Sequence, residues 1–284
     1  LGTLQRAGGS TVNKTDVNSG TVTYILPGGD IQSYTGTDYF NLSIGGAGTF
    51  TLAADTIVAN DLTLSAGTLD ANGFDLDVGG DWANSAAFTA GTGSVEFINA
   101  TKISVVTGTT GFNDLVVNEP GKTVQFQTGV TQTLNGSLLI QGTAGNYVVL
   151  EGTTAEVWTI DNLGNSESIQ YADVTYSTST TNQMDTNRSV LTTTTNWVNS
   201  GVTYTWNGTT SSDWDTSTNW TPNSPAGGPV SGDSVIIPDI TAPDDDPVLD
   251  GPETVTDLTI ESGGILDVAS QVLTIESTFE NQGT

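Results

Sequence analysis

The sequence predicts an all-β fold and, within that class, a parallel β-helix (β-solenoid) with an irregular capping or linking segment. Three observations support this prediction. Triplets of the form Leu-x-Val or Leu-x-Ile recur along the chain, turn-forming Gly, Asn, Asp and Thr fill the intervals between them, and the triplets belong to longer internal repeats. Alternation with a period of two is typical of strands that bury one face.

The alternating runs predict a series of short strands separated by turns. No run of ten residues combines helix formers with a period of 3.6, so we expect almost no helix. The clearest predicted strands are Thr21–Tyr24, Leu42–Ile44, Phe50–Leu52, Leu62–Leu64, Leu76–Val78, Val95–Phe97, Leu115–Val117, Val124–Phe126 and Leu138–Ile140.

Two internal echoes connect these runs. Parts of residues 20–44 recur in residues 93–117 at an offset of 73. A sharper echo at an offset of 197 relates residues 67–84 to residues 264–281 and places Trp82 on Phe279. Repetition with a few residues of drift is the signature of a stacked array.

A repeating unit of about 10–25 residues cannot bury its own apolar face, so it must stack on copies of itself. The solenoid achieves this, and a dozen coils at about 4.8 Å each would extend about 60 Å. Asn72, Asn84 and Asn135 are expected where coils turn, because Asn tolerates a left-handed backbone. A row of β-sandwich modules is the alternative, since Asn-Gly pairs at 72–73, 135–136 and 207–208 are compatible with hairpins.

The repeats suggest two domains. Residues 1–200 are expected to form a solenoid domain with internal repeats at about 20–92 and 93–150 and a closing segment at 151–200. Residues 201–284 are expected to start a second solenoid unit, with an opening segment rich in Trp and Pro.

Composition excludes several classes of function. The chain of 284 residues carries 32 Asp and Glu against five Lys and Arg, a formal net charge of −27, with no His and no Cys. Nucleic-acid binding and binding to anionic membranes both depend on cationic side chains, so neither is expected. The longest apolar runs are too short to insert into a membrane. Richness in Thr, Gly, Asn and Asp with few Lys indicates an extracellular or cell-surface protein.

Several strings resemble those of repetitive bacterial surface and secreted proteins. They read Phe40-Asn41-Leu42-Ser43-Ile44, Leu62-Thr63-Leu64-Ser65-Ala66-Gly67-Thr68-Leu69, Leu76-Asp77-Val78-Gly79-Gly80-Asp81-Trp82-Ala83-Asn84 and Phe88-Thr89-Ala90-Gly91-Thr92-Gly93-Ser94-Val95-Glu96-Phe97. The resemblance is to adhesin-type, filamentous-haemagglutinin-like β-helical stalks. The resemblance implies a β-helix architecture but does not predict functional residues, because such proteins resemble one another in their core and not in a shared site.

The densest acidic cluster is Asp244-Asp245-Asp246, with Asp250 close by. Closely spaced oxygen ligands suit Ca²⁺, so these four residues are a candidate metal site and calcium is the one cofactor considered. The cluster lacks the spacing of a calcium loop, and an extended, solvated acidic loop between Pro243 and Pro247 is the alternative.

Three tryptophans, Trp206, Trp214 and Trp220, lie within fifteen residues among polar neighbours. Exposed indoles beside polar groups stack on sugar rings, so these residues are a candidate carbohydrate site. Buried indoles that donate their N–H to a carbonyl would instead cap the open end of a solenoid coil.

The expected function is structural. The chain is predicted to be an extracellular repeat module of a filament shaft or adhesin stalk, with copies of itself or adjoining repeats as end-to-end partners. Joined tail to head, the two ends of the sequence read as one continuous coil, which suggests one period of a head-to-tail polymer. The alternative is a surface module that binds extracellular glycans, and no enzymatic activity is expected.

Overall fold

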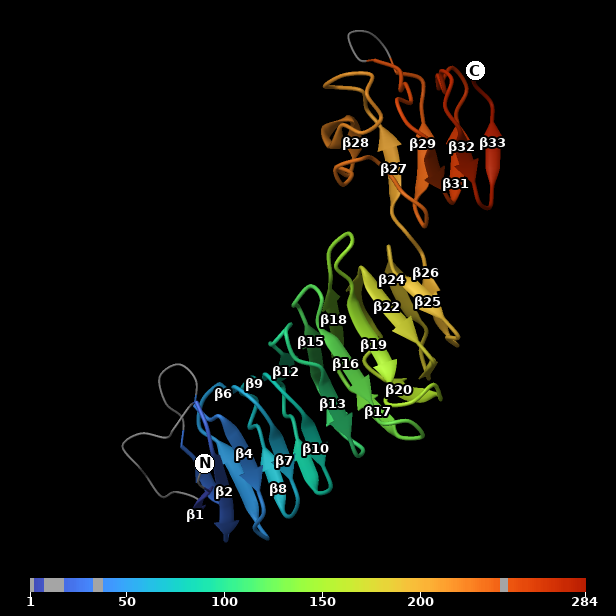
Figure 1. Ribbon diagram of the computed structural model, residues 1–284. Helices are drawn as coiled ribbons and strands as arrows, with labels where there is room; N and C mark the ends of the chain where they lie inside the picture. The colour runs from blue at the N-terminus through green and yellow to red at the C-terminus, as the bar shows by residue number, and fades with distance from the viewer. Residues whose placement is uncertain (1–2, 8–17, 33–37, 241–244) are drawn as a thin grey trace. The chain divides into compact units, whose positions relative to one another are not determined.

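The computed structural model describes residues 3–7, 18–32, 38–240 and 245–284. It is an all-β parallel β-solenoid with about 13 turns and almost no helix, which confirms the predicted fold class (Figure 1). The chain divides into two compact units, Leu1–Val198 and Asn199–Thr284.

The largest sheet of the first unit contains ten strands, one from each successive turn. All the pairings given for it are parallel, and Leu42, Leu62 and Trp82 occupy the same position in three consecutive turns. In the order of the sheet the strands are β1 (Thr3–Ala7), β2 (Thr21–Leu26), β4 (Asn41–Ile44), β7 (Leu62–Leu64), β10 (Trp82–Asn84), β13 (Ser104–Thr107), β16 (Thr123–Phe126), β19 (Val148–Gly152), β22 (Ala172–Thr175) and β25 (Val190–Thr192).

A second, eight-stranded sheet forms another face of the same turns. Its strands are β6 (Thr56–Val58), β9 (Leu76–Val78), β12 (Ser94–Phe97), β15 (Asp114–Val117), β18 (Ser137–Gln141), β21 (Ser166–Gln170), β24 (Met184–Asn187) and β26 (Trp197–Asn199).

Two four-stranded sheets complete the turns. The first contains β3 (Gly29–Ile31), β5 (Thr49–Leu52), β8 (Thr68–Asp70) and β11 (Ala87–Thr89). The second contains β14 (Gly111–Phe112), β17 (Thr131–Leu134), β20 (Trp158–Asn162) and β23 (Ser177–Thr180).

The parallel register excludes β-sandwich modules as the main architecture, because a sandwich is built from antiparallel neighbours. Among the described strand pairs, β27 with β28 is the antiparallel one. One turn takes 17 residues from Val174 to Leu191 and 26 residues from Val124 to Leu150. Strands stay aligned while the loops absorb these differences in length.

The core of the first unit is a continuous apolar stack. Inward residues of strands alternate with partly exposed ones, as in β4 and β12. Aromatic rings fill its width: Phe126 and Trp158 stack with centroids 4.3 Å apart, and Trp197 meets Trp158 edge-on at 6.3 Å. All the strands predicted from the sequence form, and the alternate apolar side chains of each point into this core, whereas Val116 and Leu139 lie at outward positions.

The second unit repeats the plan on a smaller scale. Its main sheet has the order β28 (Trp220–Thr221), β27 (Thr203–Trp206), β29 (Ser234–Ile237), β31 (Asp257–Ile260) and β33 (Phe279–Asn281). A two-stranded sheet pairs β30 (Glu253–Val255) with β32 (Leu273–Ile275). The 3₁₀ helix η1 (Ser217–Asn219) lies just before β28.

The two internal repeats in the sequence have different structural origins. The offset of 73 places β2 on β12 and β4 on β15, which belong to different sheets. The offset of 197 places β9 on β32 and β10 on β33, which hold corresponding places in their units. The structural period is therefore a single turn, and inward strands of different faces resemble one another because they share one core.

Of the three Asn residues predicted to tolerate a left-handed backbone, one adopts it. Asn72 has a φ of 55° at a turn. Asn84 instead belongs to β10 and is buried, where its amide Nδ2 donates to Thr110 Oγ1 at 3.0 Å. Asn135 does not have a positive φ, and its Nδ2 donates to the carbonyl of Phe112. For these two residues the amide is used for hydrogen bonds between turns rather than for a strained backbone.

Candidate functional site

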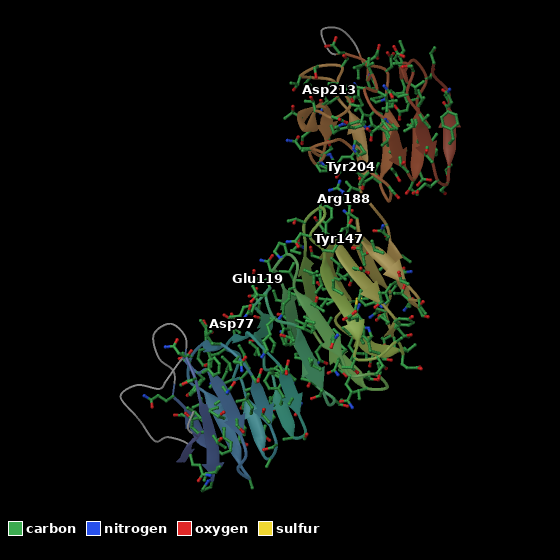
Figure 2. All side chains as sticks on the ribbon, viewed as in Figure 1. Asp77, Glu119, Tyr147, Arg188, Tyr204 and Asp213 are labelled. Atoms are coloured by element: carbon green, nitrogen blue, oxygen red, sulfur yellow. The ribbon has the colours of Figure 1, made fainter. Side chains whose placement is uncertain are left out.

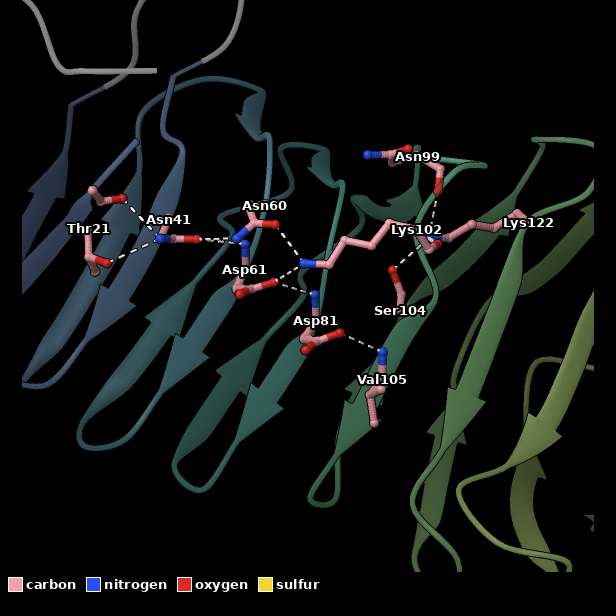
Figure 3. Close-up of polar contacts among 11 residues, drawn as sticks. Thr21, Asn41, Asn60, Asp61, Asp81, Asn99, Lys102, Ser104, Val105 and Lys122 are labelled. Atoms are coloured by element: carbon pink, nitrogen blue, oxygen red, sulfur yellow. Dashed lines mark hydrogen bonds and ion pairs between the residues drawn. The ribbon is translucent and has the colours of Figure 1, made fainter. Parts of the chain in front are cut away.

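A ladder of Asn and Asp side chains runs along the corner that leads into the ten-stranded sheet (Figure 3). Asn41 Oδ1 accepts the backbone N–H of Asp61 at 3.1 Å, and Asp61 Oδ1 accepts that of Asp81 at 2.9 Å. Asp81 Oδ1 in turn accepts the N–H of Val105 at 3.0 Å. Each side chain thus satisfies a donor in the following turn, which joins four turns by charge-assisted or amide hydrogen bonds.

Lys102 links turns that are not adjacent. Its ammonium donates to Asn60 Oδ1 at 2.6 Å and to Asp61 Oδ1 at 2.7 Å, two turns back (Figure 3). The side chain passes over Gly80, where a Cβ atom would lie 2.5 Å from Lys102 Nζ. The same Cβ would clash with Asp61 Oδ1 and lie 2.9 Å from the backbone carbon of Asn60, so a larger residue would disturb both partners of the ion pair and the neighbouring turn.

Lys122 is fully buried, with 0% of its surface exposed. Its ammonium donates to the carbonyl oxygens of Asn99 at 2.9 Å and Lys102 at 2.6 Å, and to Ser104 Oγ at 2.7 Å. Burial, followed by the nearby Lys102 charge, lowers the pKa of Lys122 from 10.5 to about 8. The lysine holds the loop before β13 onto the core, using neutral acceptors.

A second ladder follows the corner before the eight-stranded sheet. Asp55 Oδ1 accepts the N–H of Asp75 at 3.0 Å, and Asp75 Oδ1 accepts both the N–H and the hydroxyl of Ser94, at 2.8 and 2.9 Å. Asp114 receives the same pair of donors from Ser137. Part of the strong negative charge therefore serves as hydrogen-bond acceptors between turns.

Asp77 and Glu96 are outward neighbours on β9 and β12 (Asp77 is labelled in Figure 2). Burial raises the pKa of Asp77, with further contributions from Asp75 and Asp55. Burial also raises the pKa of Glu96, followed by the charge of Asp77. Like charges directly opposite each other in a sheet are destabilising.

The three tryptophans predicted as a carbohydrate site do come together, in the core of the second unit. Trp206, Trp214 and Trp220 are at most 1% exposed. Trp220 meets Trp206 and Trp214 edge-on, with centroid distances of 4.8 and 4.7 Å. Rings buried in this way present no face to a sugar, and the arrangement matches the alternative interpretation, a cap over the first turn of the unit.

Hydrogen bonds fix this aromatic cap. Trp206 Nε1 donates to the carbonyl of Asp245 at 2.7 Å, and Trp220 Nε1 donates to that of Trp214 at 2.8 Å. The side chain of buried Asn219 makes four hydrogen bonds: its oxygen accepts from the N–H groups of Thr210 and Ser211, and its Nδ2 donates to Ser211 Oγ and the Asp213 carbonyl. In the sequence, the signal that points to Asn219 is its place beside Trp220.

The predicted calcium ligands are described in part, because Asp244 lies outside the described residues. Asp245 and Asp250 are exposed and Asp246 is half-buried. Among the described residues, no group of three or more Asp, Glu, His or Cys side chains is arranged to hold a metal ion. Calcium binding by Asp244, Asp245, Asp246 and Asp250 stays a prediction.

Acidic groups of the second unit interact near β30. Burial raises the pKa of Glu253 to about 7, and the charges of Asp215 and Asp250 contribute. Burial likewise raises the pKa of Asp215, with Asp250 and Asp213 adding to the shift. Glu253 therefore keeps its proton to a higher pH than an exposed Glu does.

One edge of the second unit is open. Beside β32 and β33 lies a groove of about 300 Å³ whose apolar lining includes Leu258, Ile260, Leu266, Leu273, Ile275 and Phe279. Phe279 is 55% exposed, although it is in register with Leu258, which is 2% exposed. At this edge, core-facing apolar residues are therefore incompletely buried.

In comparisons with known proteins, no family model, no curated protein and no solved structure matches the chain. Nor do the described residues include any helix with the length and apolar character required to cross a bilayer.

Proposed function

We propose that this chain is an extracellular structural module that forms part of the shaft of a surface filament or adhesin stalk. The observation that carries the proposal is the uninterrupted parallel stack of the first unit, in which ten strands pair in succession over a filled core. At about 4.8 Å per strand such a stack extends about 45 Å. Solenoids of this kind act as spacers, because each turn is held by its neighbours alone.

The polar network supports the same role. The corner ladders connect successive turns, the Lys102 ion pair connects turns two apart, and the carboxylates involved serve as hydrogen-bond acceptors between turns. The proposal therefore assigns the chain no catalytic step. The surface location rests on composition and on the resemblance of the core strings to haemagglutinin-like stalks, and the high negative charge favours solubility.

Immunogold labelling of intact cells that produce the protein, with antibodies raised against the folded chain, tests the proposal. We expect label on the cell surface, arranged along filaments or stalks. Label confined to the cytoplasm would contradict the surface role. A glycan array with the purified chain separates the alternative function, since specific binding would require an exposed sugar site that the buried tryptophans do not provide.

Hydrogen exchange of the full chain tests the shaft itself. Because the three faces of the first unit share one core, we expect protection throughout the strands from β4 to β22. Rapid exchange over several consecutive turns would show that the stack is not a continuous stiff element, whatever its location on the cell.

A further inference from the structure

The three Asn-Gly pairs of the sequence, at 72–73, 135–136 and 207–208, lie in three different environments. An Asn that precedes Gly loses its side-chain amide readily, because glycine has no Cβ to hinder the approach of its own nitrogen to the Asn side chain. In a folded protein the reaction also requires that the amide and this nitrogen are free to meet. The three pairs therefore provide a comparison of sites within one chain.

The pair Asn135-Gly136 is tied to the preceding turn on both sides of the reacting bond, although Asn135 is exposed. Asn135 Nδ2 and the Asn135 backbone N–H both donate to the carbonyl of Phe112, each at 3.0 Å. The N–H of Gly136 donates to the carbonyl of Asn113 at 2.9 Å. A Cβ atom at Gly136 would clash with Asp114 Oδ1, so the backbone is closely packed here. Three hydrogen bonds must break before the two groups can react.

The pair Asn207-Gly208 is also held at both reacting groups. Asn207 Oδ1 accepts the N–H and the hydroxyl of Thr209, at 3.1 and 3.0 Å, and Asn207 Nδ2 donates to Thr221 Oγ1 at 2.9 Å. Gly208 is buried, and its N–H donates to the carbonyl of Asn219 at 3.4 Å. The amide and the nitrogen are therefore both engaged with other groups.

The pair Asn72-Gly73 lies in the turn between β8 and β9, where Asn72 is exposed and has a φ of 55°. Among the described residues, neither the Asn72 side chain nor the N–H of Gly73 has a hydrogen-bond partner. Two hydrogen bonds hold the turn: the Asn72 N–H donates to Asp70 Oδ1, and the Phe74 N–H donates to the carbonyl of Ala71, both at 2.9 Å. Neither bond reaches another turn of the solenoid.

The space around Gly73 is also more open. Among the described residues, a Cβ atom at Gly73 would have Thr92 alone within 4 Å, with Thr92 Oγ1 at 3.0 Å and its backbone nitrogen at 3.8 Å. A rotation that brings the Asn72 side chain over the Gly73 nitrogen therefore requires the opening of one exposed turn. Local opening of this kind costs far less than opening of the core strands.

We propose that Asn72 is a site of spontaneous deamidation in the folded protein, and that the fold protects Asn135 and Asn207. The backbone nitrogen of Gly73 attacks Cγ of Asn72 and loses its proton. The new N–Cγ bond closes a five-membered succinimide ring, and Nδ2 leaves with the proton as ammonia. Water then opens the ring at one of its two carbonyl carbons, which gives aspartate or isoaspartate. Either product carries one more negative charge than asparagine, and water is the one co-reactant.

The surrounding strands allow the product to accumulate. Isoaspartate moves a methylene group from the side chain into the main chain and so lengthens the turn. β8 is paired with β5 and β11, and β9 is paired with β6 and β12, so each strand stays in register through neighbours on both sides. The turn absorbs the change, as other loops absorb differences in length. The reaction depends on this turn alone and is independent of the proposed shaft role.

Peptide mapping by mass spectrometry tests the proposal on the whole chain. The folded protein is incubated in mildly alkaline buffer and sampled over time, beside a sample unfolded in guanidinium chloride. In the folded protein we expect Asn72 to convert at least about tenfold faster than Asn135 or Asn207, because those two react only after hydrogen bonds to other turns or loops open. In the unfolded chain we expect the three rates to agree within about threefold, because only the local sequence then acts.

Asn72→Gln is the control variant, since glutamine keeps the amide but would have to close a larger ring. We expect it to abolish the early conversion and to leave the rates at Asn135 and Asn207 unchanged. Equal rates at the three sites of the folded protein, or faster conversion at Asn135 or Asn207, would overturn the proposal. The same holds if Asn72 stays intact in the folded protein for the time in which the unfolded chain is fully converted.

Discussion

Lys122 offers a quantitative test of how the core treats a buried charge. In the folded state its pKa is about 8, against 10.5 for the exposed side chain. Below pH 8 the lysine is charged in both states, so burial costs its full amount. Between pH 8 and 10.5 the unfolded chain keeps the proton and the folded chain does not, so stability rises with pH by about 1.4 kcal/mol per unit. The total gain is at most about 3 kcal/mol, using the same conversion.

The measurement compares the wild-type chain with Lys122→Met, which keeps an unbranched side chain one heavy atom shorter than that of lysine and cannot be charged. Urea unfolding of both proteins at several pH values from 7 to 10.5 gives the difference in their free energies of unfolding. Groups common to both proteins cancel in this difference. We expect the difference to move in favour of the wild type as pH rises through this window and to be flat below it. A difference that is constant, or that moves the other way, would refute the claim that the buried ammonium is destabilised.

Three further predictions concern packing and charge. Gly80→Ala should destabilise the chain by about 1–3 kcal/mol in urea unfolding, because the new Cβ clashes with Asp61 Oδ1 and with the backbone carbon of Asn60 in addition to displacing the Lys102 ammonium. Lys102→Met should cost at most about 1 kcal/mol, because it removes only a part-exposed ion pair. Trp158→Ala should cost about 3–5 kcal/mol, and Val157→Ala, at an exposed neighbour, should change stability by less than about 0.5 kcal/mol. The pKa of Glu253 is about 7 in the folded state and 4.5 when the side chain is exposed, so the contribution of Glu253 to stability falls as pH rises from 4.5 through 7. Scanning fluorimetry should therefore show that Glu253→Gln loses less melting temperature between pH 5 and 8 than the wild-type chain does.

The strands are predictable from the sequence because each one carries its own alternation of apolar and polar residues, bounded by turn formers. Leu62-Thr63-Leu64 alternates apolar and polar residues and ends at turn formers, and nothing distant is needed to recognise it. The face to which a strand belongs was not predictable in the same way. Strands of different sheets share one core and therefore one pattern, so the offset of 73 compared β2 with β12 across two faces.

The candidate site was likewise predictable only in part. The residue types of the tryptophan cluster were evident, whereas the choice between a sugar platform and a cap depended on burial, which composition does not give. Lys102 and Lys122 looked like isolated cations in the sequence. Their roles arise from partners in other turns, such as Asp61, which lies 41 residues before Lys102, and no local pattern reports contacts at that separation.

The one-turn spacing of the contacts has a consequence for how length and stability are related. In the ten-stranded sheet each strand pairs only with the strand of the turn before and the turn after. Each added turn therefore buries a similar apolar area, forms a similar number of hydrogen bonds and loses a similar amount of conformational entropy. The entropic cost of closing a loop does not rise as the stack grows. A pull on one end should peel turns away in sequence and leave the remainder folded, so damage stays local.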